Sequence, residues 1–221
     1  MAIIKTQNLI GLSVRRLSLA GIVLVAGATQ SFAQSIFTNP ITGTNPNTAD
    51  PYTTGQTVAA NMTASGIGRG AGITGAAANN RYNASSWNTA SLDTTAFFTF
   101  TLTPNPTYKL SLTSFVYTGQ ASGTGPTTFE FRSSADGFAA GIGAPTAGGT
   151  TISLAAPAYQ GLTTGIEFRL YGYNASASAG TFSVNDFTFN GSVDLPEPSS
   201  LALIGLGLAG VAATIRRRKA N

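Results

Sequence analysis

Apolar and polar residues alternate through much of the chain after residue 94, a pattern typical of half-buried β-strands. The clearest segments are 94–103 and 107–118, separated by Pro104-Asn105-Pro106. One face of the first carries Ala96, Phe98, Phe100 and Leu102, and one face of the second carries Tyr108, Leu110, Leu112 and Val116. Prolines and asparagine favour a turn, so these two segments are predicted to form a hairpin.

Four further segments have strand character: 127–132, 150–154, 165–174 and 180–193. The last one changes phase, since Phe182 and Val184 alternate in one register and Phe187 and Phe189 in the other. An extra residue in a strand restores the facing of the residues beyond it. A β-bulge is therefore predicted at Asn185-Asp186.

The region 34–81 is rich in Thr, Asn, Gly and Ala, and it contains one plausible strand at 56–64 and a glycine-dense loop at 66–75. Six or more antiparallel strands without an amphipathic helix indicate an all-β protein. The expected fold is an antiparallel β-sandwich of jelly-roll topology, spanning residues 34–194.

Residues 1–33 have the pattern of a secretory signal peptide. The cations Lys5, Arg15 and Arg16 precede an apolar stretch at 17–28. The segment ends with the small-x-small pattern Ser31-Phe32-Ala33, which predicts cleavage between Ala33 and Gln34. The alternative, an N-terminal core helix, is disfavoured because the segment has no polar face.

The C-terminal segment 195–221 contains Pro196-Glu197-Pro198, then an apolar run at 201–215, then the cations Arg216, Arg217, Arg218 and Lys219. A helix of that run would be about 22 Å long, against a hydrocarbon core of about 30 Å. The four cations resist transfer into hydrocarbon and stay on the cytoplasmic side. We expect a short transmembrane helix that holds the preceding domain outside the inner membrane.

In this order, the Pro-Glu-Pro triplet, apolar helix and terminal basic cluster resemble the PEP-CTERM sorting domain of Gram-negative bacteria. The resemblance implies that Pro196, Glu197 and Pro198 form a motif recognised by an exosortase, a multi-pass membrane protease or transpeptidase. Two prolines keep the backbone extended and lacking amide donors, so the segment would remain open to an enzyme. An ordinary membrane anchor that is never cut is the alternative.

The net charge of +4 comes from the two ends of the chain. Between residues 34 and 194 there are five cations and seven carboxylates, a net charge of −2. Such a domain has no basic patch to follow a phosphate backbone, so nucleic acid is not an expected partner. There are no cysteines, so the domain depends on its core rather than on disulfides.

Candidate catalytic and metal-binding groups are few, because the chain has no His and no Cys. Glu130 and Glu167 could serve as the two acids of a glycosidase. Each also stands two residues from an arginine, which predicts solvent-facing ion pairs instead. Asp136 and Asp186 could bind calcium, but a turn and a bulge explain them more simply. No catalytic residue, cofactor or metal site is predicted.

Aromatic side chains are the best binding candidates in the domain: Tyr82, Trp87, Tyr117, Tyr159, Tyr171 and Tyr173. Tyr171 and Tyr173 fall on the polar side of their strand beside Arg169. If exposed, these three residues, with Trp87, would suit carbohydrate binding, because sugars stack on aromatic faces. A second packed sheet or a covering loop would explain the same pattern.

Two functional hypotheses follow. The first is a non-enzymatic envelope or matrix protein, exported through the inner membrane and then released or attached at the cell surface, as the resemblance implies for bacteria that produce exopolysaccharide. The second is a carbohydrate-binding module. The segment 108–191 also resembles the domains that precede such tails, which are similar to carbohydrate-binding jelly rolls.

Overall fold

The computed structural model describes residues 34–43, 45–196 and 207, and nearly all regular structure within them is β-strand. The strands are β1 (Gln34–Asn39), β2 (Thr57–Val58), β3 (Met62–Arg69), β4 (Thr74–Gly75), β5 (Tyr82–Ser85), β6 (Phe97–Pro104), β7 (Lys109–Ala121), β8 (Thr128–Ser133), β9 (Gly149–Ser153), β10 (Ile166–Tyr173) and β11 (Phe182–Asp194). Two short 3-10 helices, η1 (Ser134–Asp136) and η2 (Pro157–Tyr159), follow β8 and β9. The predicted signal peptide lies outside the described residues.

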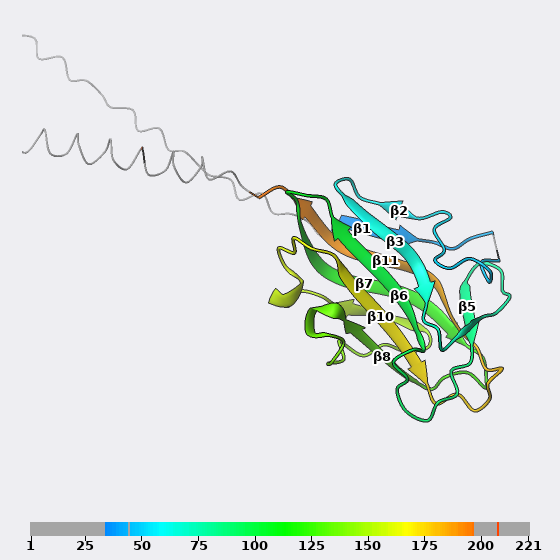
Figure 1. The fold of residues 1–221 in the computed structure, drawn as a ribbon. Coiled ribbons are helices and arrows are strands. Elements are labelled where there is room, and N and C mark those ends of the chain that lie inside the picture. Colours follow the sequence, from blue (N-terminus) through cyan, green and yellow to red (C-terminus); the bar gives the residue numbers. More distant parts are fainter. Residues whose placement is uncertain (1–33, 44, 197–206, 208–221) are drawn as a thin grey trace, which may run out of the picture. The chain divides into compact units, whose positions relative to one another are not determined.

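The strands form two antiparallel sheets that face each other (Figure 1). The larger sheet has the order β2-β1-β11-β5-β4, and β7 also pairs with β11 and carries β9 on its other edge. The smaller sheet has the order β3-β6-β10-β8. The all-β, antiparallel prediction is confirmed, whereas this strand order does not confirm the predicted jelly-roll topology.

Strand β11 organises the larger sheet, because three other strands pair with it. One edge pairs with β7 over its full length, and the other edge pairs first with β5 and then with β1. The register with β7 shifts between Val184 and Asp186, so Asn185 is the extra residue of a bulge. As a result Phe182, Val184, Phe187 and Phe189 all face the core, each 0% exposed. The predicted bulge is confirmed.

Phenylalanine rings from both sheets fill the core. Phe115 of β7 lies 4.5 Å from Phe189 of β11 and 4.7 Å from Phe131 of β8, measured between ring centroids. Phe131 in turn stacks on Phe168 of β10 at 5.3 Å. Aromatic pairs at these separations add about 0.5–1.5 kcal/mol each beyond the burial of their surface. The two sheets are therefore joined by a continuous aromatic layer.

The connection between β6 and β7 is not the predicted hairpin. A turn is present, because the Tyr108 amide donates to the Asn105 carbonyl at 3.0 Å. However, β6 pairs with β3 and β10 while β7 pairs with β11 and β9, so the turn crosses between sheets. Hairpins and such crossings share the same alternation and turn residues. Only the packing distinguishes the two arrangements. Here Phe100 and Phe115 lie in different sheets and contact each other across the core, with ring centroids 5.1 Å apart.

The inner face of β7 also differs from the prediction in its second half. Phe115 and Tyr117 face the core, and Val116 is only half-buried. Thr113 is passed over in the register with β11, which shifts the phase by one residue. The predicted facing of Val116 was wrong because Val116 is apolar and continues the alternation of Leu110 and Leu112, which hides the change of phase at Thr113.

The predicted strand 56–64 is split into β2 and β3 by a turn at Asn61, whose φ is 65°. Strand β3 then continues through Gly66, a residue of the predicted glycine-dense loop 66–75. Gly66 has a φ of +88°, and a Cβ there would lie 2.5 Å from the Tyr52 carbonyl oxygen. This glycine is required by a close backbone approach within the sheet.

Arg69, at the end of β3, holds the irregular segment that precedes β2. Its guanidinium carbon lies 3.7 Å from the centroid of the Tyr82 ring. Its terminal nitrogens donate to the carbonyls of Pro46, Asn47, Ala49 and Asn83. Burial lowers the pKa of Arg69 and raises that of Tyr82. The hydrogen bonds from Arg69 therefore take the place of strand pairing and hold this polar segment against the sheet.

Deleting Asn185 should unfold or strongly destabilise the protein, because one half of β11 would turn its apolar side chains to solvent. Two large side chains lost from the core remove roughly 1.5–3 kcal/mol each, against a total stability of about 5–15 kcal/mol for a domain. Urea unfolding of residues 34–196 measures the effect.

The matched control is Asn185→Ala, which keeps the residue count and loses the hydrogen bond from Ser183 Oγ at 2.9 Å, worth about 1 kcal/mol. An unfolding midpoint for the deletion equal to that of Asn185→Ala would show that the bulge does not set the facing of β11.

Candidate functional site

The body, which we define as residues 34–194, has its first strand beginning and its last strand ending at the same end of the larger sheet. Gln34 starts β1 and is the register partner of Gly191 in β11. Strand β11 continues to Asp194, which is still paired with Lys109 of β7. Leu195 then leaves the sheet and is 59% exposed. We call this end of the sheet, visible where β1 starts and β11 finishes in Figure 1, the tail pole.

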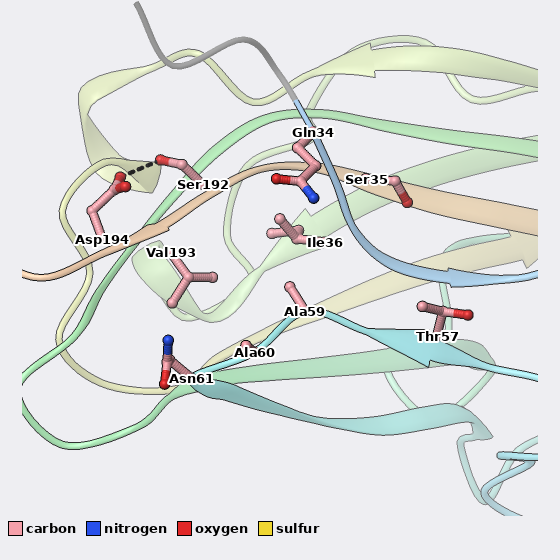
Figure 2. A pocket seen from close by; sticks show the side chains of 10 residues that line it. All are labelled: Gln34, Ser35, Ile36, Thr57, Ala59, Ala60, Asn61, Ser192, Val193 and Asp194. Atoms are coloured by element: carbon pink, nitrogen blue, oxygen red, sulfur yellow. Dashed lines mark hydrogen bonds between the residues drawn. The ribbon is translucent and has the colours of Figure 1, made fainter. Parts of the chain in front are cut away.

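A hollow of about 350 Å³ opens at the tail pole (Figure 2). Its walls are the start of β1, the turn between β2 and β3, and the end of β11, and its lining includes Gln34, Ile36, Ala60, Asn61, Ser192 and Asp194. Ser192 Oγ donates to Asp194 Oδ2 at 2.5 Å. The turn is tied to β1 because the Ala59 amide donates to the Ile36 carbonyl at 2.8 Å. The hollow is thus lined mainly by polar and small side chains.

Residues 194–219 match the family model described as the PEP-CTERM protein-sorting motif. The chain carries a PEP-CTERM sorting motif. The match begins at Asp194, the last residue of β11, so the sorting motif starts where the sheet ends. No curated protein and no solved structure matches the chain.

The PEP-CTERM motif implies an exported protein that an exosortase sorts, with a fate at the cell surface or outside the cell. The resemblance seen in the sequence is thereby confirmed. Pro196 is described and follows the exposed Leu195. Outside the described residues lie Glu197, Pro198, all of 201–215 except Gly207, and the cluster Arg216, Arg217, Arg218 and Lys219. Their roles stay predictions.

Within the described ranges, no helix has the length and apolar character needed to cross a membrane. The predicted signal cleavage lies directly before β1, since Gln34 is the first residue of that strand. Ala33 is outside the described residues, and cleavage after it stays a prediction. A cut there would leave Phe37, which is buried and paired with Phe189, inside an intact strand.

A second group of chemically distinctive side chains lies on the face of the smaller sheet that points away from the core. We call it the outer cluster, and its members are Phe97, Glu130, Arg132, Phe138, Glu167, Arg169, Tyr171 and Tyr173. On β10 the intervening residues Phe168 and Leu170 face the core. The predicted binding residues of β10 are therefore brought together by strand alternation, as expected.

Arg169 is the centre of the outer cluster. Its guanidinium carbon lies between two rings, 4.3 Å from the centroid of Phe97 and 3.8 Å from that of Phe138. Its Nε donates to Glu167 Oε1 at 2.6 Å. Burial alone would lower the pKa of Arg169, but the hydrogen bonds and charges of Glu167 and Tyr171 outweigh it and raise the pKa. Its side chain remains 24% exposed, which leaves part of the cation open to solvent.

Arg132 makes the corresponding pair on β8. Its Nη2 lies 2.6 Å from Glu130 Oε2, and its Nη1 donates to the Phe138 carbonyl at 2.9 Å. The other oxygen of Glu130 accepts from the Tyr173 hydroxyl at 3.1 Å. The two ion pairs predicted from the spacing, Glu130 with Arg132 and Glu167 with Arg169, are thus both present.

Two of the predicted carbohydrate-binding residues are not on an accessible surface. Tyr171 is 1% exposed, since Phe97 packs edge-on against it at 5.4 Å and the Arg132 guanidinium lies 6.0 Å from its ring centroid. Trp87 is 0% exposed and packs against core rings of both sheets, with its Nε1 donating to the Ala84 carbonyl at 2.8 Å. Neither ring can stack on a sugar. Only Tyr173 and Arg169 remain partly exposed.

The other aromatic candidates, Tyr82, Tyr117 and Tyr159, are also buried. The Tyr117 hydroxyl donates to the Thr146 carbonyl at 2.6 Å, and burial raises the pKa of Tyr117 to about 12. These rings fill the core. The prediction missed Phe97 and Phe138, because they lie in other segments of the chain and only the tertiary fold brings them against Arg169.

Glu130 and Glu167 share the outer face, but each carboxylate is turned onto its own arginine. Glu130 is the register partner of Tyr171, four residues along β10 from Glu167. Their backbones are therefore about 13 Å apart along the strand direction. Glycosidases hold their two carboxyl groups about 5–9.5 Å apart.

Asp136 and Asp186 have structural partners. The carboxylate of Asp136 accepts from the amides of Ala139 and Ala140, and Gly137 follows with a φ of 69°. Asp186, beside the bulge, accepts from the Thr118 hydroxyl. No group of three or more His, Cys, Asp or Glu side chains suited to a metal ion occurs in the part of the chain that the structure describes.

Proposed function

We propose that the protein is a non-enzymatic component of the cell envelope or extracellular matrix. It is carried across the inner membrane as an exported chain, held there by its tail, and released or attached when an exosortase acts near Pro196-Glu197-Pro198. The observation that carries the proposal is the sorting motif, which begins at the last paired residue of the body. A folded body and a processing signal thus adjoin without a linker.

The chemistry of the body supports a structural role. Its two candidate catalytic carboxylates are engaged in ion pairs, and most of its candidate binding aromatics fill the core. Association with the exopolysaccharide or biofilm of a Gram-negative-type bacterium is the setting in which proteins with such tails are expected to act. In this setting the body acts as a stable β-rich structural surface and does not catalyse a reaction.

The test of sorting is the intact mass of the protein recovered from its native host. We expect a mature species that lacks 201–221, because the tail is removed near the triplet. Replacing both prolines, Pro196→Ala and Pro198→Ala, should leave the full tail in place. The matched control is Ser199→Ala with Ser200→Ala, which should be processed normally. A wild-type protein that still carries 201–221 outside the cell would refute the proposal.

A second candidate function is carbohydrate binding by the outer cluster. The observation that favours it is the partly exposed Arg169 cation, held between Phe97 and Phe138, with the Tyr173 side chain on the same strand. The Arg169 guanidinium is already held in place, so it can donate hydrogen bonds to sugar hydroxyl or carboxylate groups without a further loss of side-chain conformational entropy. Trp87 and Tyr171 have no part in this version.

Retention of the purified body on a panel of polysaccharide gels tests the second function. The double variant Arg169→Met and Tyr173→Ala should lose at least tenfold in retention if the outer cluster binds sugar. Arg81→Met is the control, since Arg81 is hydrogen-bonded to Gln120 elsewhere on the surface. Absence of wild-type retention on every gel, or equal retention by the double variant, would eliminate carbohydrate binding at this face.

A further inference from the structure

The tail pole and the Pro-Glu-Pro triplet are separated by very little chain. Asp194 is held in the sheet by its pairing with Lys109, and Glu197 follows three residues later. Three residues of fully extended chain span at most about 10 Å. Any enzyme that acts at the triplet must therefore approach the folded end of the body to within the length of a side chain or two.

The membrane sets a second limit. If the membrane helix begins at Leu201, as the sequence predicts, seven residue steps separate it from Asp194. Such a chain reaches at most about 24 Å. Before processing, the tail pole is thus confined close to the membrane surface, where the active site of a membrane-embedded exosortase would act.

The surface that meets this enzyme contains the hollow of about 350 Å³ (Figure 2). A volume in the lower part of the range of ligand pockets, about 300–1,000 Å³, accommodates one or two side chains of a partner loop. The lining of the hollow includes Asp194, Ser192 and Asn61; the Ser192 hydroxyl already donates to Asp194 Oδ2, so Asp194 and Asn61 are the polar groups left for a partner. A loop that donates hydrogen bonds, or carries a cation for Asp194, fits it.

We propose that the hollow at the tail pole is a docking surface for an extracytoplasmic loop of the exosortase. The exosortase then recognises the folded body together with the tail. This contact raises the local concentration of the Pro-Glu-Pro triplet at the active site of the enzyme. This inference rests on the proposed function, since it presupposes that the tail is processed.

The test is a pulse–chase measurement of tail removal from the full chain in its native host. Ala60, at the exposed tip of the turn between β2 and β3, lines the hollow. Ala60→Arg fills the hollow without entering the core, so processing should slow at least fivefold. The matched control is Ala179→Arg, an exposed position in the loop before β11, at the opposite end of that strand. It should be processed at the wild-type rate.

The outcomes separate the two proposals. An unprocessed wild-type chain would overturn the proposed function itself. Normal processing of wild type with equal rates for Ala60→Arg and Ala179→Arg would overturn the docking surface and leave the proposed function standing. Equal resistance of both variants to limited proteolysis shows that the body is folded in each, so a slow rate for Ala60→Arg alone supports docking.

Discussion

The larger sheet depends on one requirement: β11 must bury apolar side chains from Phe182 to Phe189 while three other strands pair with its two edges. A regular strand with this sequence would turn either Phe182 and Val184 or Phe187 and Phe189 to solvent. The extra residue Asn185 resolves the conflict. It also lies where β5 gives way to β1 along one edge, so the bulge and the change of partner occur together.

From this arrangement follows the position of the sorting motif. Since β11 is fully paired with β7 up to Asp194, the body ends abruptly and the exposed Leu195 begins the tail. Since β1 lies antiparallel to the end of β11, the predicted start of the mature chain lies at the same pole. The predicted signal cleavage and the start of the sorting motif thus lie in one small region of the surface.

Features that depend on local chemistry were predictable from the sequence. Aromatic residues on both sides of Asn185 revealed the bulge, and spacing of two residues revealed both ion pairs. The bulge at Thr113 was harder to see, because the apolar Val116 continues the alternation of Leu110 and Leu112 past it. Likewise, a turn at Asn105 predicts a reversal of the chain but not whether the next strand joins the same sheet.

The burial of aromatic residues on the outward face was the second feature that could not be predicted from the sequence. Alternation assigns Tyr171 to the polar face, yet it cannot show that Phe97 from β6 and Arg132 from β8 cover the ring. Trp87 lies outside any strand, so alternation assigns it no face, and its place against Phe98 and Phe182 depends on the tertiary fold. The tail motif could be recognised from the sequence, because it is defined by the order of its residues and not by tertiary packing.

The central claim is that the folded sheet continues to Asp194, the residue at which the sorting motif begins. Hydrogen–deuterium exchange of the full-length protein tests it most directly. Amides of residues 186–193 should be among the slowest to exchange, and the Leu195 amide should exchange at the rate of an open chain. Exchange of 190–193 as fast as that of Leu195 would contradict the account, since the motif would then follow a frayed strand rather than a folded end.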